Sequence, residues 1–262
     1  MLSARSLYQE ILDNDYAFRL FCSIAASGEA QGGWENGRIA ALVPEAQREL
    51  APKISRHGAD EDKHGRIFSA LLHRRGLHPL PVPPEADYTM LLERAGIGLA
   101  HARLLGDEPL TEQDIVTYLS HSRVTEQRAS EQMAMLTKYF GDHPDVGKAV
   151  RMISHDEDNH LSYCHEELLR LAREGHGRTI QRILHECSLA EIRIYRDVSL
   201  AVTAHMGRIL GWGRTKAVLL RLGIHATYGY ERFGGRRRMV TLAMPKRRDA
   251  MGGPAPPRSD AA

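Results

Sequence analysis

Two widely separated strings of the form D-E-D-x-H constrain the fold of this chain more than any other feature. Glu61 and His64 are three residues apart in the first string, and Glu157 and His160 have the same spacing in the second. On an α-helix, this spacing places a carboxylate and an imidazole on one face, one turn apart. The strings are therefore either two solvated acidic clusters on surface helices or the two halves of a site that binds a pair of metal ions.

The composition limits the class of protein. The chain has 262 residues, of which 42% are hydrophobic and 26% charged, as in an ordinary soluble globular protein with a sizeable core. No stretch approaches the roughly 18 apolar residues of a membrane span, and the N-terminus lacks the apolar core of a secretory signal, so we expect a cytoplasmic protein without membrane contact. Cys22, Cys164 and Cys187 form no C-x-x-C pair, which excludes a zinc ribbon or a rubredoxin-type iron centre.

Apolar residues recur at helical spacing along most of the chain, and no run of β-alternation is convincing, which predicts an all-α protein. The predicted helices cover approximately residues 7–42, 44–75, 88–104, 111–139, 146–174, 179–210 and 215–230. Pro52 predicts either a kink in the second helix or a later start. The order is a helical hairpin, a long crossover that opens with a proline-rich passage at 76–87, and a second hairpin. This order is that of a ferritin-like four-helix bundle with one long crossover, followed by a C-terminal helical extension.

Three regions follow from this order. We expect residues 1–174 to form the bundle, residues 175–232 to form a helical extension that packs on it, and residues 233–262 to form a basic, disordered tail. From Arg232 onward, the chain carries eight Lys or Arg against two Asp. Such a tail could bind nucleic acid or an acidic carrier protein, or only keep the chain soluble.

A di-metal site inside a bundle also requires a carboxylate from each of the two other helices at the same height. The turn of the second hairpin is centred near Asp142. Glu157 follows it by 15 residues and Glu126 precedes it by 16, so these two side chains are expected to face each other. Glu131 precedes the turn by only 11 residues, an axial mismatch of about 6 Å.

The same argument applies to the first hairpin, whose turn is centred near Pro44. Glu61 follows this turn by 17 residues and Glu29 precedes it by 15. Glu35 precedes it by 9 and is mismatched by about 12 Å. Glu29 is therefore the predicted partner of Glu61, although glycines near the turn make its height less certain.

The predicted ligands are four carboxylates and two imidazoles, which are Glu29, Glu61, His64, Glu126, Glu157 and His160. Oxygen and nitrogen ligands without thiolate favour iron or manganese. Two divalent ions would balance four glutamates that are otherwise destabilising inside a bundle or take up protons. His57 is a candidate third histidine ligand because it lies on the same helix face as Glu61 and His64; a bundle-facing or surface histidine is the alternative. Tyr118 and Tyr163 are expected near this site, with a packing, hydrogen-bonding or radical role.

With this ligand set, residues 7–174 resemble the ferritin-like di-iron carboxylate proteins. The strings "EDKH" at 61–64 and "EDNH" at 157–160 correspond to their two E-x-x-H helices. Asp60 and Asp156 match the D-E-x-x-H form of the ribonucleotide reductase small subunit and the bacterial multicomponent monooxygenases, which implies that each Asp orients a ligating histidine. The segments 61–79 and 126–133 also resemble bacterial tRNA-hydroxylating di-iron proteins.

The resemblance implies an O₂-dependent di-iron oxidoreductase that hydroxylates, desaturates or N-oxygenates an organic substrate with electrons from an external donor. The alternatives are an iron-handling ferroxidase or storage-like protein and a di-iron tRNA hydroxylase whose basic tail binds RNA. Manganese or a mixed Mn/Fe pair would use the same ligands, and a homodimer is compatible with the sequence. A large apolar pocket beside the metals, built by the crossover at 76–110 and the helices after Glu174, would favour the enzyme over storage.

Overall fold

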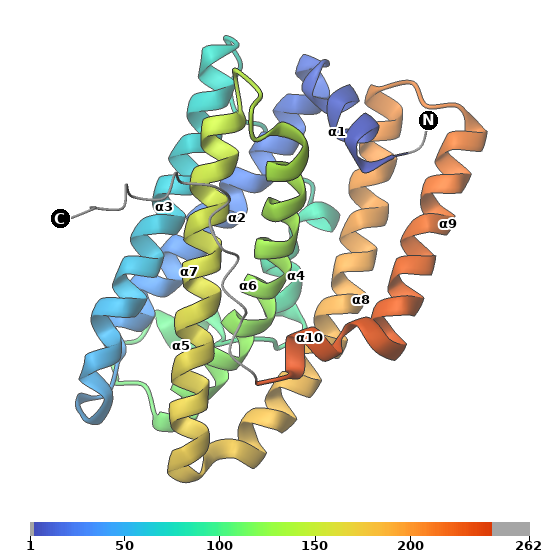
Figure 1. The fold of residues 1–262 in the computed structure, drawn as a ribbon. Helices are drawn as coiled ribbons and strands as arrows, with labels where there is room; N and C mark the ends of the chain where they lie inside the picture. Colours follow the sequence, from blue (N-terminus) through green and yellow to red (C-terminus); the bar gives the residue numbers. More distant parts are fainter. Residues whose placement is uncertain (1–2, 243–262) are drawn as a thin grey trace, which may run out of the picture.

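The computed structural model describes residues 3–242, and all regular elements in this range are helical (Figure 1). The α-helices are α1 (Ala4–Leu12), α2 (Asp15–Leu42), α3 (Ala51–Arg74), α4 (Tyr88–Arg94), α5 (His101–Leu104), α6 (Glu112–Phe140), α7 (Gly147–Leu171), α8 (Gly177–Ile209), α9 (Arg214–Tyr230) and α10 (Arg237–Val240). Short 3₁₀ segments form η1 (Glu45–Leu50) and η2 (Pro84–Ala86), and π-helical turns form η3 (Ala172–His176) and η4 (Glu231–Gly235). The prediction of an all-α protein is confirmed for these residues.

Four long helices form the body of the molecule, with α2 beside α3 and α6 beside α7 (Figure 1). The α3 helix contacts α7, which joins the two hairpins, and α8 packs against α6 on another side. The connection between α3 and α6 contains η2, α4 and α5, which contact α2 and α8 rather than extending the bundle. The chain therefore has the predicted order of hairpin, crossover, hairpin and helical extension.

The predicted helix at 88–104 is divided into α4 and α5, and the first two predicted helices of the chain are also divided. The first breaks at Asn14, whose side chain accepts hydrogen bonds from the backbone N–H groups of Tyr16 and Ala17 and so caps the start of α2. The second begins with η1 and becomes α-helical only at Ala51, with Pro52 in the first turn. Proline is favoured there because the first turn of a helix has no backbone acceptor for its missing N–H.

The α2 and α3 helices approach closely where glycines face one another. A Cβ on Gly58 would lie 3.1 Å from the carbonyl oxygen of Gly33 and 3.2 Å from the backbone nitrogen of Gly37. No ordinary side chain fits between these backbones without separating the helices. The glycines near the first turn therefore determine the spacing of the helix pair that carries Glu29 and Glu61.

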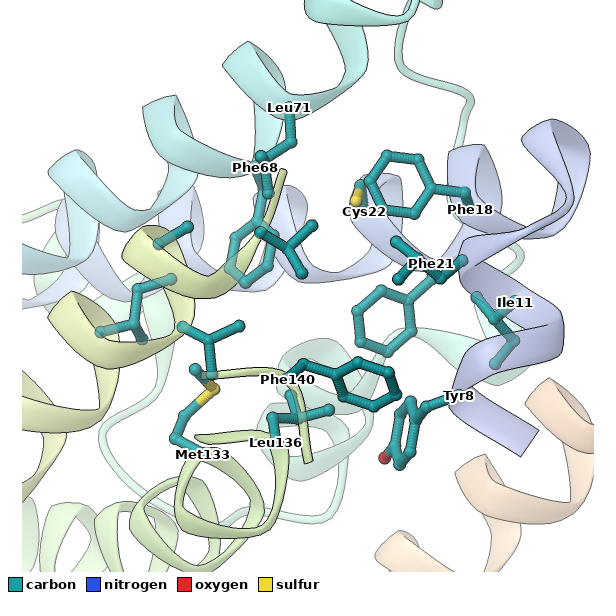
Figure 2. A pocket seen from close by; sticks show the side chains of 15 residues that line it. Tyr8, Ile11, Phe18, Phe21, Cys22, Phe68, Leu71, Met133, Leu136 and Phe140 are labelled. Atoms are coloured by element: carbon teal, nitrogen blue, oxygen red, sulfur yellow. The ribbon is translucent and has the colours of Figure 1, made fainter. Parts of the chain in front are cut away.

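Apolar clusters lie on both sides of the level at which the predicted ligands occur. One cluster includes Ile54, Leu119 and Leu168. The other includes Phe68 and Met133, and it surrounds a small apolar cavity of about 60 Å³ (Figure 2). The ligand level is thus separated from water by packed side chains above and below it.

The C-terminal extension is connected to the bundle through buried charges. Arg128 of α6 forms ion pairs with Glu191 of α8 at 2.8 Å and with Glu231 of η4 at 2.7 Å, and all three side chains are buried. The α9 helix packs against α8 without burying any residue completely.

Part of the segment expected to be a disordered tail is helical. Residues 233–242 contain the end of η4 and α10, in which Met239 is fully buried and Arg238 forms ion pairs with Glu131 and Glu231. Met239 and the ion pairs of Arg238 anchor this segment to the rest of the protein. The remainder of the predicted tail, residues 243–262, lies outside the described residues.

Replacing Gly58 with Ala is expected to lower the free energy of unfolding by about 1–3 kcal/mol, since the added methyl group overpacks the contact between α2 and α3. Urea unfolding measures the change. Gly37→Ala is the control because a Cβ there meets nothing within 4 Å, and it should stabilise the helix by about 0.5–1 kcal/mol. Equal effects at the two positions would contradict the close approach.

Candidate metal centre

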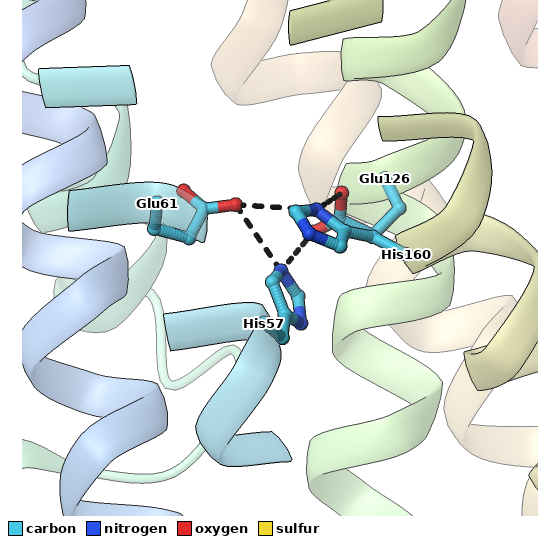
Figure 3. A group of neighbouring side chains, drawn as sticks. All are labelled: His57, Glu61, Glu126 and His160. Carbon is cyan, nitrogen blue, oxygen red and sulfur yellow. Dashed lines mark hydrogen bonds and ion pairs between the residues drawn. The ribbon is translucent and has the colours of Figure 1, made fainter. Parts of the chain in front are cut away.

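Two groups of ligand-type side chains lie between the helices, and all of them come from α2, α3, α6 and α7. The first group contains His57, Glu61, Glu126 and His160 (Figure 3). Its ligand atoms lie within 4.8 Å of one another. Nε2 of His57 is 3.1 Å from Oε1 of Glu61 and 3.4 Å from Oε1 of Glu126. Nδ1 of His160 is 3.5 Å from the same Glu61 oxygen.

The second group contains Glu29, Glu61, His64 and Glu157, again with ligand atoms within 4.8 Å. Nδ1 of His64 is 3.2 Å from Oε2 of Glu29 and 3.4 Å from Oε1 of Glu157. The other oxygen of Glu157 lies 3.7 Å from Nδ1 of His160. Glu61 therefore belongs to both groups, and Glu157 faces a histidine of each.

All six predicted ligands and His57 come together in this arrangement. His57, Glu61 and His64 occupy one face of α3 because their spacing follows the helical repeat. The rejected carboxylates are elsewhere: Glu131 pairs with Arg238, and Glu35 pairs with His101. The glutamates at similar distances from each hairpin turn are thus the ones that the structure brings together.

The two aspartates contact the histidines crosswise. Oδ2 of Asp156 on α7 is 3.1 Å from Nε2 of His64 on α3. Oδ2 of Asp60 on α3 is 3.6 Å from Nε2 of His160 on α7. Each aspartate thus faces the ring nitrogen that points away from the carboxylate cluster, which leaves Nδ1 free to face a metal ion. The sequence suggested that each aspartate orients a ligating histidine. It did not suggest that each aspartate contacts the histidine of the other helix.

Lys63 was not predicted as part of the site. Its ammonium lies 2.6 Å from Oδ1 of Asp60 and 2.7 Å from Oδ2 of Asp156. One cation therefore connects the two aspartates that contact His64 and His160. Lys63 lies within the first D-E-D-x-H string, but the spacing of that string does not indicate which way its side chain points.

A chain of hydroxyl groups orients His57. Nδ1 of His57 is 2.8 Å from the hydroxyl of Tyr163, which is 2.8 Å from the hydroxyl of Tyr118. The Tyr118 hydroxyl donates to Oδ1 of Asn36 at 2.6 Å. With Nδ1 engaged in this chain, Nε2 of His57 is the nitrogen that faces the carboxylates. This contact gives Tyr163 and Tyr118 a hydrogen-bonding role beside the site.

Burial makes the carboxylates sensitive to their neighbours. Burial and the adjacent Glu61 carboxylate raise the pKa of Glu29 well above its usual value of 4.5. Burial would also raise the pKa of Glu157, but the adjacent imidazoles of His160 and His64 outweigh it and lower the pKa. Burial and neighbouring charges therefore shift the pKa values of these two carboxyl groups in opposite directions.

The neighbouring carboxylates raise the pKa values of the three histidines. Burial would lower the pKa of His57, but the Glu126 carboxylate outweighs it and raises the pKa to about 9. Against the same effect of burial, the Glu157 carboxylate raises the pKa of His64 to about 11, and Glu126 raises that of His160 to about 11. Protons thus provide positive charge at the positions from which a metal ion would displace them.

Hydrogen bonding provides an independent test of whether these residues fit a metal. Among the described side chains, Oε2 of Glu126 and both ring nitrogens of His160 are buried without a hydrogen-bond partner. Buried polar atoms of this kind are costly unless something binds them. Oxygen and imidazole donors converging from four helices are the ligands that iron and manganese accept. The residues therefore fit a metal ion.

A large cavity of about 660 Å³ reaches the ligand cluster. Glu29, Glu61, Glu126 and Glu157 form part of its wall. Much of the remaining wall is apolar and comes from α1, α2, α4, α6, α8 and α9, including Leu7, Ile24, Leu92, Met133, Val202 and Ile224. The carboxylate cluster is thus accessible to a molecule that occupies this cavity.

Comparison with known proteins yields no relative. The chain matches no protein-family model, no curated protein and no solved structure. Among residues 3–242, no helix combines the length and the apolar character needed to cross a bilayer.

Binding of a divalent ion to metal-free protein at pH 7 is expected to release protons. His57, His64 and His160 have pKa values of about 9, 11 and 11, so they are protonated at this pH and must lose protons to ligate. Titration with Zn²⁺ in a weakly buffered pH indicator measures the release, with the same titration into buffer as control. Metal binding should weaken as the pH falls. Binding without proton release would contradict the assignment of these imidazoles as ligands.

Proposed function

We propose that this chain is a ferritin-like di-iron protein that uses O₂ to oxidise an organic substrate. One observation supports this proposal above all: two ligand groups share Glu61 and open onto a large, mainly apolar cavity. A carboxylate common to two groups suits a bridge between two ions, as in di-iron bundles built from two E-x-x-H helices and two further glutamates.

The residues have distinct roles in this proposal. Glu29, His64 and Glu157 would hold one ion, and His57, Glu126 and His160 would hold the other, with Glu61 available to both. Asp156 and Asp60 orient the imidazoles of His64 and His160, and Tyr163 orients that of His57. Four glutamates balance the charge of two divalent ions, so the loaded centre carries little net charge despite its burial.

Ferrous ions held by these residues would supply the redox chemistry with which O₂ reduction begins. For a hydroxylation, each substrate consumes one O₂, two electrons and two protons; one oxygen atom enters the C–H bond and the other leaves as water. The proposal assigns these two electrons to an external donor. The buried carboxylates and imidazoles are the nearest groups that hold or accept protons.

The cavity favours an enzyme over an iron-storage protein. Iron ions in transit require polar or acidic surfaces. Much of this cavity wall is apolar instead, including Leu7, Ile24, Leu92, Val202 and Ile224. An apolar cavity beside a metal centre suits an organic substrate. Manganese or a mixed pair would use the same donors, so the choice of iron belongs to the proposal.

Iron content and O₂ uptake test the proposal. Protein loaded anaerobically with ferrous iron should bind about two ions per chain and consume O₂ when a reductant is supplied. Glu157→Gln should reduce both quantities severely, since an uncharged amide would replace a carboxylate that faces a histidine of each ligand group. Glu166→Gln is the matched control because Glu166 lies exposed on the same helix. Equal iron content in the two variants, or no iron in the unaltered chain, would refute the site.

A further inference from the structure

The cavity beside the ligand cluster is long. On α2 alone, its lining residues recur every three or four positions, from Phe21 through Ile24, Gly28 and Glu35 to Ile39. This stretch of helix is about 27 Å long at ~1.5 Å per residue. The cavity therefore runs along the bundle rather than forming a compact pocket at one point.

The ligands meet the cavity within its length rather than at one end. On α2, Glu29 lies between the lining residues Phe21 and Ile39. On α6, Glu126 lies between the lining residues Tyr118 and Leu136. A long occupant would consequently place an interior part beside the carboxylates.

Positive charge on the cavity wall is neutralised. Arg128 is the one Lys or Arg among the residues that line this cavity. Its guanidinium donates two hydrogen bonds to Glu191, at 2.8 and 3.0 Å, and two to Glu231, at 2.7 and 2.8 Å. Both carboxylates are buried, so this arginine has no free face with which to hold a carboxylate or phosphate of a ligand.

The acidic side chains of the cavity wall outside the ligand cluster also have partners. Among the lining residues, Glu35 and Asp87 are the acidic side chains that do not belong to the two ligand groups. Glu35 is 2.7 Å from Nε2 of His101, and Asp87 caps α4 by accepting a hydrogen bond from the backbone N–H of Met90. What remains is apolar surface with a few neutral groups, including Thr89, Gln132, Ser199 and Thr203.

We propose that the cavity binds an elongated, uncharged and mainly apolar molecule. Outside the ligand cluster, a charged head group would have to shed its water without gaining an oppositely charged partner on this wall, which is costly. An apolar chain gains free energy with each methylene buried. The claim that this molecule is the substrate of the metal centre rests on the proposed function. The claim that it binds in the cavity rests only on the residues of the cavity wall.

Binding measurements test the class of ligand. The neutral fluorophore N-phenyl-1-naphthylamine is bound to metal-free and to iron-loaded protein and then displaced. Affinity should rise with chain length from 1-hexanol to 1-dodecanol, and dodecanoate should bind at least tenfold more weakly than 1-dodecanol. A plateau at hexanol would overturn the elongated shape. Equal or tighter binding of dodecanoate would overturn the uncharged class.

Two variants assign the binding to this cavity. Ser199→Trp fills part of the wall and should weaken dodecanol binding at least tenfold, whereas Gln181→Trp, at an exposed position of the same helix, should not. Glu231→Gln removes one of the two carboxylates on Arg128 and should increase dodecanoate affinity at least tenfold. Dodecanol affinity unchanged by Ser199→Trp in a folded protein would overturn the assignment.

Iron content and O₂ uptake measured on the same samples keep the two proposals distinct. Selective dodecanol binding without O₂ uptake supports this inference and contradicts the proposed oxidase function. O₂ uptake in a protein that prefers dodecanoate supports the oxidase and overturns this inference.

Discussion

The mutual repulsion of four carboxylates in a buried space is the constraint on which the rest of the structure depends. Glu29, Glu61, Glu126 and Glu157 come from four different helices, and apolar clusters keep water away on both sides of their level. At short range and low dielectric, such charges repel strongly unless cations lie among them. Three imidazoles with raised pKa provide this charge in the metal-free chain, and two metal ions would provide more. Metal binding at this centre would therefore be coupled to folding.

The C-terminal extension forms part of the wall of the cavity beside this centre. The α8 and α9 helices cover one side of the bundle and contribute Val202, Leu220 and Ile224 to the cavity wall. The ion pairs of Arg128 with Glu191 and Glu231 connect this cover to α6. Breaking a buried pair by removing one partner is costly, so the same network holds the wall in place and withholds its arginine from a ligand.

The sequence predicted the helices and which side chains lie together, because both follow from periodicity. The i, i+3 spacing placed Glu61 with His64, and similar distances from a hairpin turn selected Glu29 and Glu126. Periodicity says nothing about the rotation and separation of packed helices, so the crosswise aspartates, the Tyr163 contact and the bridge at Lys63 were not predictable in detail. The break at Asn14 and the helix at 237–240 were missed for another reason: each depends on a local cap or a buried anchor that weak apolar periodicity does not reveal.

The most direct test of the central claim is anomalous X-ray diffraction at the iron absorption edge from crystals of the ferrous-loaded protein. The account predicts two iron peaks, one among Glu29, His64 and Glu157 and the other among His57, Glu126 and His160, with the Glu61 carboxylate between them. A single peak, or iron bound only outside these two groups, would contradict the shared di-metal centre. The proposed function would then lose the observation that supports it.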